Sequence, residues 1–515
     1  MNYRYFIFFG LFYFHSIPVF AQLLVSGYFG DQMVIQRNQP ITIWGTEKPG
    51  VKVTVELGTL KGEVKSDGNG NWRVTLGALP ASGPLELKVA DGDESETFRE
   101  IMIGDVWLIS GQSNVVLPLM ATIEWPKIKK KNTFNNIRFC KIPNSFSLEP
   151  VAMFSNPVSW VKGDPAKVGM LSGVGYYFAR TVQPAIGVTL GIVQGSSGGT
   201  QIEQWMPSKA LKAVDPNNPN FVAHDKTMMA MKAESHANAN TLDNAGDKEE
   251  GQTDPDTNST THNKLVKTKK VNSNPKVNAM TAGTASLFND TIYPLQYAKI
   301  TGVVWYQGES NTLAQVDYGL LLKTLIQSWR GVFEEPELPF VVVQLPGFGL
   351  VKDDGWMRMR EAQRLTVAEM GQSLVVTIDL GSSTTIHPPN KREVGRRCGL
   401  AALEHIYHQT VEGTSPFPKI IQFSGDTVKV GFDGFKGDLL TRGKSPQGFE
   451  VSGSDGKFIV ASAKVEGRYV FVHAEGVPHP QKIRYLWASF PETIDLYSVA
   501  GLPVVPFQSN VSECE

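Results

Sequence analysis

The first patterned segments of the chain are short and alternate apolar with polar residues. Runs rich in Val, Ile and Thr, namely ITIWG, VKVTVEL, WRVTLG and LELKVA, lie between Leu23 and about Thr97, and turn clusters such as EKPG and SDGNGN separate them. Alternation with a period of two places every second side chain on one face of a strand. The pattern therefore predicts a small antiparallel β module over residues 22–100.

A different pattern begins at Ile101. Continuous apolar segments now follow one another, namely IMIGDVWLIS, VTLGIVQG, ITGVVWYQG, LPFVVVQL and SLVVTIDL. Helix-like stretches such as GVGYYFARTVQ and YGLLLKTLIQSWR lie among them. Strands that are apolar on both faces and alternate with helices are typical of a parallel sheet covered on both sides. The sequence therefore predicts an α/β domain over residues 101–410.

Two further segments complete the expected organisation. Alternating strand patterns return in IIQFSGDTVKVGFDG, KFIVASAKVEGRYVFVHA and KIRYLWASF, which predicts a second β module over residues 411–515. Within the α/β domain, residues 233–278 are polar, mixed in charge and poor in apolar side chains. Such a segment cannot bury enough surface to offset the entropy of ordering, so we expect a mobile insertion. A lid over a ligand is the alternative interpretation.

Residues 1–21 have the layout of a cleavable secretory signal. Arg4 precedes an apolar run that ends in Val-Phe-Ala just before Gln22. The run is short and interrupted, which disfavours the alternative of a membrane anchor, and no other stretch is long and apolar enough to span a bilayer. We therefore expect a periplasmic or secreted protein that has no membrane contact once the signal is removed.

Charge and cysteine content narrow the class of partner. The 49 basic and 50 acidic residues give a net charge of -1, so nothing indicates a polyanionic partner such as nucleic acid, and a neutral glycan fits better. Cys140, Cys398 and Cys514 are far apart and odd in number, so we predict no dense disulfide framework. The histidines show no metal-ligand spacing, and we expect neither a metal nor another cofactor. The sequence does not indicate an oligomeric state.

Ser113 is the first candidate for chemistry. It lies in GQSN directly after the strand IMIGDVWLIS, so its hydroxyl is expected at the strand's carboxyl end and near a helix start, where open α/β sheets bind ligands. Free N–H groups and the positive end of a helix dipole suit the oxyanion that forms when a serine attacks an ester. Alone, a serine at this position is more often a helix N-cap than a nucleophile.

Three further motifs also follow predicted strands. The glycines of GSSGGTQ, residues 195–201, leave backbone amides able to point at a ligand, although a simple turn is the alternative. In WYQGESN, Gln307 or Asn311 could donate another hydrogen bond to an oxyanion. His387, in IHPP, is the side chain best suited to accept a serine proton near neutral pH. Because carboxyl ends of parallel strands share one edge, a single site explains these motifs better than separate coincidences do.

Together the motifs GQSN, GGT, WYQGESN and IHPPNKREVGRR resemble those of the sialate O-acetylesterase family of SGNH hydrolases. The flanking segments DQMVIQRNQPITIWGTEKPG, LLTRGKSPQGFEVSG and RYLWASFP resemble the family's two β modules, so the resemblance covers nearly the whole chain. It implies a three-layer, flavodoxin-like parallel-sheet core flanked by N-terminal and C-terminal β modules. It also implies a carbohydrate O-acetylesterase acting on O-acetylated sialic acids. Acetylated plant polysaccharides such as xylan are the alternative substrates.

The resemblance also implies roles for individual residues. Ser113 is expected to take up the acetyl group, and His387 is expected to shuttle the proton before water releases acetate. The backbone N–H groups of Ser113 and Gly199 and the side-chain amide of Gln307 are the expected oxyanion hole. The expected substrate contacts are Asn114, Asn311 and Trp205. For Trp205, a place in the protein core is the alternative.

The sequence departs from the family at the position of the triad acid. Family members commonly have an Asp two or three positions before the His, where this chain has Thr384 and Thr385. A triad acid orients the imidazole and stabilises its charged form, so a Ser-His dyad of lower activity is expected without it. Glu309 is the preferred substitute acid, and Asp379 and a backbone carbonyl are alternatives. A catalytically weakened glycan-binding protein on the same scaffold is the second hypothesis.

Overall fold

The computed structural model describes residues 22–130, 134–143, 145–154, 157–214, 284–314, 317–351 and 353–510. The expected signal peptide, the polar segment 233–278 and Cys514 lie outside these residues, and the predictions about them stay predictions. Cys140 and Cys398 are both buried, free thiols. Over the described ranges, every helix is too short or too polar to cross a bilayer.

The N-terminal part of the described chain consists of strands. They are β1 (Leu24–Val25), β2 (Val34–Gln36), β3 (Ile41–Thr46), β4 (Lys52–Leu57), β5 (Leu60–Lys65), β6 (Asn71–Leu76) and β7 (Ser82–Ala90). Strands β1, β3 and β6 form one antiparallel sheet, and β4 pairs antiparallel with β5 and β7. In β6 the buried side chains are Trp72, Val74 and Leu76, so the alternation in the sequence places one face of the strand in the core.

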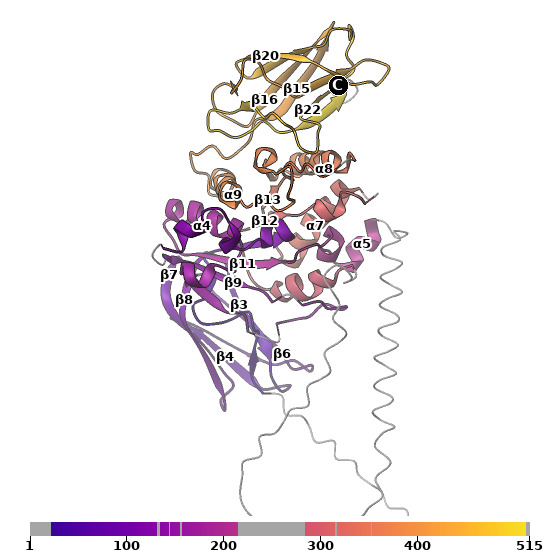
Figure 1. Cartoon of the computed structure of the whole chain (residues 1–515). Helices are drawn as coiled ribbons and strands as arrows, with labels where there is room; N and C mark the ends of the chain where they lie inside the picture. Colours follow the sequence, from indigo (N-terminus) through magenta and orange to yellow (C-terminus); the bar gives the residue numbers. More distant parts are fainter. Residues whose placement is uncertain are drawn as a thin grey trace, which may run out of the picture.

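Strand β8 (Ser95–Gly111) joins this part to the parallel sheet (Figure 1). Its first half pairs antiparallel with β7, and its second half pairs in parallel with β11 (Leu190–Ser196) and β12 (Gly302–Tyr306). The expected boundary at residue 100 therefore falls inside one continuous strand. The strand ends at Gly111, whose φ is +129° and where a Cβ would lie 2.0 Å from the carbonyl oxygen of Tyr306, so only glycine fits.

The central sheet has the strand order β10-β9-β11-β8-β12-β13-β14. The strands not yet given are β9 (Phe134–Lys141), β10 (Trp160–Gly163), β13 (Phe340–Val343) and β14 (Ser373–Val375). From β9 to β14 neighbours pair in parallel, and β10 is antiparallel at the edge. Every residue of β11 to β14 is buried, which explains their continuous apolar sequences. The predicted α/β class is confirmed.

Helices pack around this sheet (Figure 1). The longer ones are α4 (Gly173–Ile186), α7 (Tyr318–Val332), α8 (Gly355–Glu369) and α9 (Lys391–His405), and the shorter ones are α1 (Ser113–Val116), α2 (Trp125–Ile128), α3 (Pro165–Val168) and α5 (Ser208–Val214). Helix α4 packs along α9, and α7 contacts α8 and α5. Single turns are η1 (Leu119–Ala121), η2 (Ile202–Trp205), η3 (Phe288–Ile292), η4 (Tyr293–Leu295), η5 (Glu309–Asn311) and η6 (Ile378–Leu380). Ser172 caps α4 and Asp317 caps α7, since each side chain accepts a hydrogen bond from an N–H of the first turn.

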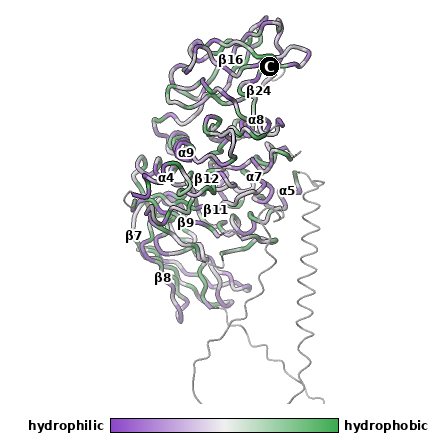
Figure 2. The backbone as a smooth tube through the Cα atoms, in the orientation of Figure 1, coloured by the Kyte–Doolittle hydropathy of each residue, from purple (hydrophilic) through white to green (hydrophobic). Residues whose placement is uncertain are grey.

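The C-terminal part again consists of strands. They are β15 (Phe417–Ser424), β16 (Thr427–Asp433), β17 (Leu440–Thr441), β18 (Phe449–Ser452), β19 (Ile459–Val460), β20 (Ser462–Glu466), β21 (Tyr469–His473), β22 (Lys482–Tyr485), β23 (Leu496–Tyr497) and β24 (Phe507–Asn510). Two four-stranded antiparallel sheets, β15-β16-β21-β20 and β19-β18-β22-β24, make up most of it. Buried Arg360 of α8 fastens this part to the core by donating to the carbonyls of Ala488 and Ser489. Hydrophobic and hydrophilic stretches are mixed in all three parts, so each supplies apolar residues to its own interior (Figure 2).

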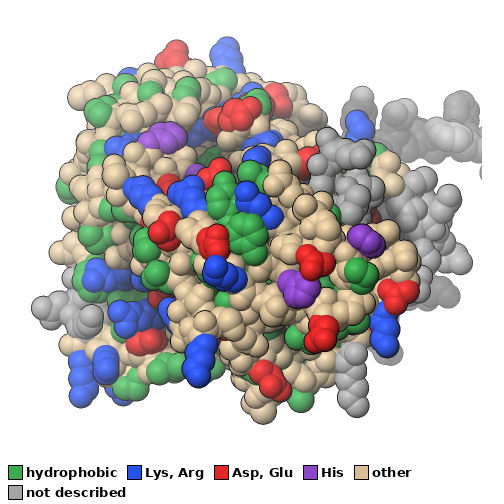
Figure 3. Space-filling model, turned by 90° about the horizontal axis from the view of Figure 1, so that it is seen from above, with side chains coloured by type: hydrophobic (Ala, Val, Ile, Leu, Met, Phe, Trp, Pro, Cys, Tyr) green, Lys and Arg blue, Asp and Glu red, His purple; other side chains and the backbone are tan. Residues whose placement is uncertain are grey.

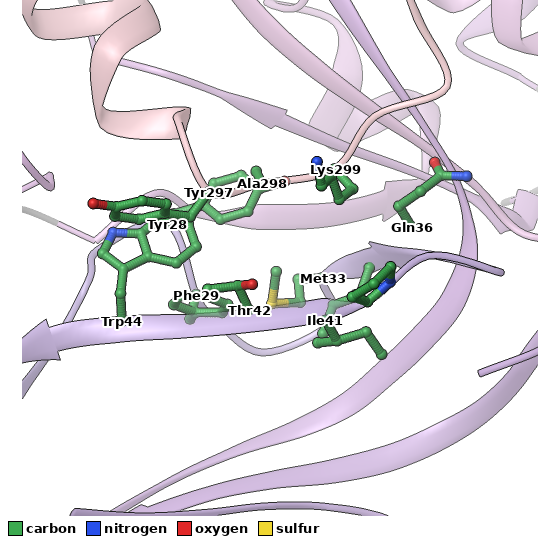
Figure 4. Close-up of a pocket in the computed structure, with 12 residues that line it drawn as sticks. Tyr28, Phe29, Met33, Gln36, Ile41, Thr42, Trp44, Tyr297, Ala298 and Lys299 are labelled. Carbon is green, nitrogen blue, oxygen red and sulfur yellow. The ribbon is translucent and has the colours of Figure 1, made fainter. Parts of the chain in front are cut away.

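Aromatic side chains fill the junction between the N-terminal strands and the core (Figure 4). The rings of Tyr28 and Trp44 stack with centroids 6.0 Å apart, and Tyr297 meets Trp44 edge-on at 5.6 Å. The cavity that remains has a volume of about 20 Å³. That volume holds about one water molecule, so the junction is a packed interface and not a ligand site.

Candidate active site

The turns after three neighbouring strands meet at one edge of the sheet. The N–H of Gln112, after β8, donates to the carbonyl of Tyr306 at 3.0 Å, and the N–H of Ser197, after β11, donates to Gly111 at 3.1 Å. The chain runs from β8 to β11 on one side of β8 and then to β12, β13 and β14 on the other. Such a reversal of strand order opens a crevice at the carboxyl ends of the strands.

Ser113 lies in this crevice as the first, half-buried residue of α1. Gly198 faces it, since a Cβ on that glycine would lie 3.6 Å from the Cβ of Ser113. Within the described residues, the backbone N–H groups of Ser113 and Gly199 have no hydrogen-bond acceptor. Gly199 has a φ of +72°, a conformation that glycine adopts without strain. Two unused amide donors therefore flank the serine, as an oxyanion requires.

His387 lies in the exposed loop between β14 and α9. The preceding residue is tied to the nucleophile turn, because Asn114 Nδ2 donates to the carbonyl of Ile386 at 3.0 Å. Neither the His387 ring nor the Ser113 hydroxyl makes a hydrogen bond to another described residue. Partial burial, and next the charge of Lys391, lower the pKa of His387. The structure brings the two segments together and favours the neutral imidazole that a general base requires.

A buried polar network holds this arrangement. Asn114 is fully buried, and its Nδ2 also donates to Glu309 Oε1 at 2.5 Å, while its Oδ1 accepts from Lys391 Nζ. The Lys391 ammonium lies 5.6 Å from the ring centroid of Tyr306. The side chain of Asn114 therefore joins η5, the His387 loop and the start of α9 to the nucleophile turn.

Burial disfavours charge on both ionisable members of the network. It lowers the pKa of Lys391 to about 7, against the opposing attraction of Glu309. Burial likewise raises the pKa of Glu309, against its hydrogen bond from Asn114 and the charge of Lys391. Glu309 Oε2 has no hydrogen-bond partner among the described residues. A buried network of this kind stabilises one geometry because each unpaired group is costly.

Within the described part of the chain, no carboxylate is hydrogen-bonded to the His387 ring as a triad acid would be. Glu309 Oε1 accepts from Asn114, and among the described residues the Glu309 carboxylate makes no hydrogen bond to His387. Asp379 is used elsewhere, since both of its oxygens accept from the Arg397 guanidinium at 2.7 Å. Glu309 as the substitute acid stays a prediction.

Gln307 is fully buried and its amide is already occupied. Its Nε2 lies 3.0 Å from Gln112 Oε1, 3.1 Å from the Thr200 carbonyl and 2.7 Å from Asn311 Oδ1. The Tyr318 hydroxyl donates to Gln307 Oε1 at 2.8 Å. Because an amide nitrogen carries two hydrogens, three acceptors leave none for an oxyanion. The expected oxyanion role of Gln307 is therefore corrected: it positions the turns around Ser113.

Known proteins resemble this chain along most of its length. Residues 272–403 match the family model described as carbohydrate esterase, sialic acid-specific acetylesterase. Sialate O-acetylesterase of Rattus norvegicus is 25% identical and covers 95% of this chain and 94% of its own length; the Homo sapiens protein is 24% identical, with 95% and 92% covered. The crystal structure of XAC1771, a carbohydrate acetylesterase from Xanthomonas citri, is 30% identical with a TM-score of 0.78, and the match covers 95% of this chain and 99% of that one. This chain belongs to the sialate O-acetylesterase family. The expected family is confirmed, and the protein is an ester hydrolase.

The residues expected to contact substrate in this acetylesterase are buried. Trp205 is 0% exposed, its indole N–H donates to Thr200 Oγ1 at 3.0 Å, and its ring packs edge-on against Trp305. Its expected place on a sugar face is wrong, and the alternative place in the core is correct. Asn311 donates to Glu203 Oε2 at 2.9 Å, so its amide, like that of Asn114, is used within the protein.

Lys391 is the site residue of this acetylesterase that the sequence analysis missed. It lies four residues after His387, within the motif IHPPNKREVGRR, and it is the first residue of α9. A cation at a helix N-terminus opposes the helix dipole. This conflict does not single out Lys391 in the sequence, because the neighbouring Arg392 shares it and is exposed. Among the described residues, no cluster of three His, Cys, Asp or Glu side chains could hold a metal ion.

Proposed function

We propose that this family member removes O-acetyl groups from glycans through an acetyl-enzyme intermediate on Ser113. The Ser113 oxygen attacks the acetyl carbonyl, and the N–H groups of Ser113 and Gly199 stabilise the oxyanion. His387 takes the serine proton and gives it to the departing sugar oxygen. Water then attacks the acetyl-serine with His387 again as base, and acetate leaves.

One contact carries this proposal. The hydrogen bond from Asn114 to the Ile386 carbonyl joins the residue after Ser113 to the residue before His387. It fixes the histidine loop at the same strand edge as the two unused amides. Because no described carboxylate bonds the His387 ring, we propose a Ser-His dyad in which a backbone-anchored loop orients the imidazole.

The proposed substrates are O-acetylated sialic acids. The family model and the mammalian relatives carry that substrate in their descriptions and support this choice. A broader carbohydrate range is the second candidate, because XAC1771, described only as a carbohydrate acetylesterase, has the higher identity. Acetate release from acetylated sialic acid and acetylated xylan under the same conditions distinguishes the two.

The fold and location complete the proposal. We propose a three-layer, flavodoxin-like SGNH-hydrolase core. When the additional parallel strand β9 is set aside, the order β11-β8-β12-β13-β14 is the doubly wound order 2-1-3-4-5, which supports this proposal. We also propose export to the periplasm or the medium, supported by the signal-like layout of residues 1–21. N-terminal sequencing of the mature protein tests the export.

The test compares acetate release from an aryl acetate by wild type, Ser113→Ala and His387→Ala. We expect each variant to lose about a thousandfold or more in kcat, because removing a triad member leaves only the oxyanion hole and binding. Ser328→Ala is the matched control, since this half-buried serine of α7 donates only to the Leu325 carbonyl. Equal rates for wild type and Ser113→Ala would end the proposal.

A further inference from the structure

A second hollow lies between α2, α4 and α9, next to the His387 loop. Its volume is about 360 Å³, which is within the range of small-molecule sites. Helix α9 begins four residues after His387, and the N–H of Ile123, just before α2, donates to the Pro389 carbonyl at 3.3 Å. The walls of this hollow are therefore attached to the active-site loop.

Four cations line the hollow, Lys127 from α2, Arg180 from α4, and Arg392 and Arg396 from α9. The lining has a single carboxylate, Glu124, which already accepts from the Tyr177 hydroxyl at 3.1 Å. The chain as a whole has no such excess, since its net charge is -1, and basic and acidic side chains are interspersed on the face in Figure 3.

Most of this positive charge is not neutralised by the protein. Lys127 and Arg392 are exposed and have no ion-pair partner among the described residues. The Arg180 guanidinium lies 3.6 Å above the centroid of the Phe134 ring and has no carboxylate within the described part. Arg396 is the exception, with a bidentate pair to Glu393.

The arrangement opposes helix stability, so the fold alone does not explain it. Arg392 and Arg396 are four residues apart on α9, where like charges repel across one turn. Arg392 lies in the first turn of the helix, where the dipole disfavours cations. A cleft lined by charges of one sign raises the local concentration of ions of the opposite sign. An anionic ligand would offset both unfavourable terms.

We propose that this hollow binds the carboxylate of an acidic sugar unit in the glycan whose acetyl ester reaches Ser113. Arg180 and Arg392 supply planar guanidinium groups, one of which can pair with a carboxylate through two parallel hydrogen bonds while the other donates to one of its oxygens. Tyr176, Tyr177 and Ile128 line the walls with apolar surface, against which a sugar ring can pack. This inference rests on the proposed function and adds a site outside the Ser113 crevice.

The first test measures kcat/KM of the full-length enzyme for an O-acetylated carboxylated sugar and for its neutral carboxamide analogue. We expect wild type to prefer the carboxylate and Arg180→Gln/Arg392→Gln to reduce that preference about tenfold, mainly through KM. High salt should weaken the preference in wild type. Arg99→Gln removes an exposed arginine paired with Glu86 on the N-terminal strands and should keep the preference. An unchanged preference in the double variant would overturn the proposal.

A binding measurement keeps the test independent of turnover. The Ser113→Ala protein is titrated calorimetrically with the carboxylated sugar, its carboxamide and inorganic phosphate. We expect the carboxamide to bind about tenfold more weakly than the carboxylate, and the Arg180→Gln/Arg392→Gln changes to remove that difference. Equal affinities, or tighter binding of phosphate than of the sugar, would overturn the acidic-sugar site. Wild type that releases no acetate from either sugar would instead contradict the proposed function.

Discussion

Replacing Asn114 by Ala tests whether the buried network holds the catalytic geometry. The substitution removes three hydrogen bonds, to Glu309, to the Ile386 carbonyl and from Lys391. The two hydrogen bonds that involve ionisable groups contribute about 1.5–3 kcal/mol each to stability, and the third, a neutral hydrogen bond, contributes about 1 kcal/mol. Since these terms are not additive, we expect a loss of about 3–5 kcal/mol, which is less than their simple sum.

The effect on catalysis follows from the contact to Ile386. Without it the His387 loop is no longer fixed against the Ser113 turn, and a displacement of about 1 Å at a reacting group costs about 100-fold in rate. We therefore expect kcat for an aryl acetate to fall about 100-fold at a temperature where the variant is still folded. Chemical denaturation gives the stability, and steady-state kinetics on the same sample gives kcat.

Asn289→Ala is the control for this prediction. Asn289 is also buried, but its side chain donates only to the Ser147 carbonyl, at 3.1 Å. We expect it to lose about 1–2 kcal/mol and to keep kcat within about twofold. If Asn114→Ala lost the same stability as predicted and kept full kcat, the network would be structural only, and the reasoning about the histidine loop would be refuted.

Three further predictions concern single side chains. Glu309→Gln should lower kcat more than Asp379→Asn does, because Glu309 is hydrogen-bonded to Asn114 in the Ser113 turn. Asp379→Asn should mainly destabilise the protein, by about 3–5 kcal/mol, because its ion-pair partner Arg397 is buried; the reverse ranking of kcat would assign an acid role to Asp379. Lys391→Met removes a positive charge that lowers the pKa of His387, and the pKa of His387 should therefore rise. The acidic limb of the pH profile of kcat/KM should then move to higher pH, and an unmoved limb would contradict the coupling between the two residues. Trp205→Phe removes the buried hydrogen bond to Thr200, so it should lower the denaturation midpoint and leave KM unchanged. A raised KM would indicate that the Trp205 side chain contacts the substrate.

The sequence indicated the fold because its periodicities differ along the chain. The fully buried strands β11 to β14 appear as continuous apolar runs, and α4 and α7 appear as amphipathic stretches between them. The boundary near residue 100 was placed less well. Strand β8 pairs with β7 and then, without a break, with β11 and β12. The N-terminal strands and the central sheet are therefore distinguished only by which strands pair with β8, and strand pairing cannot be read from the sequence.

The meeting of the strand ends could also be predicted, but the side-chain roles within it could not. Parallel strands place Ser113 and Gly199 at one edge whatever their neighbours are. Whether Gln307 or Trp205 faces a ligand depends on which acceptors and rings pack around it, and both proved fully buried. Residue types therefore identified where the site lies, whereas burial decided which polar groups remain free to act in it.

The most direct test of the account is to trap the acetyl group. Wild-type enzyme is mixed with an aryl acetate, quenched with acid during turnover and digested, and the peptides are analysed by mass spectrometry. We expect an acetyl group on the Ser113 hydroxyl of the quenched wild type and none in the Ser113→Ala protein treated in the same way. Acetylation of another residue that persists in the Ser113→Ala protein, with turnover intact, would contradict it.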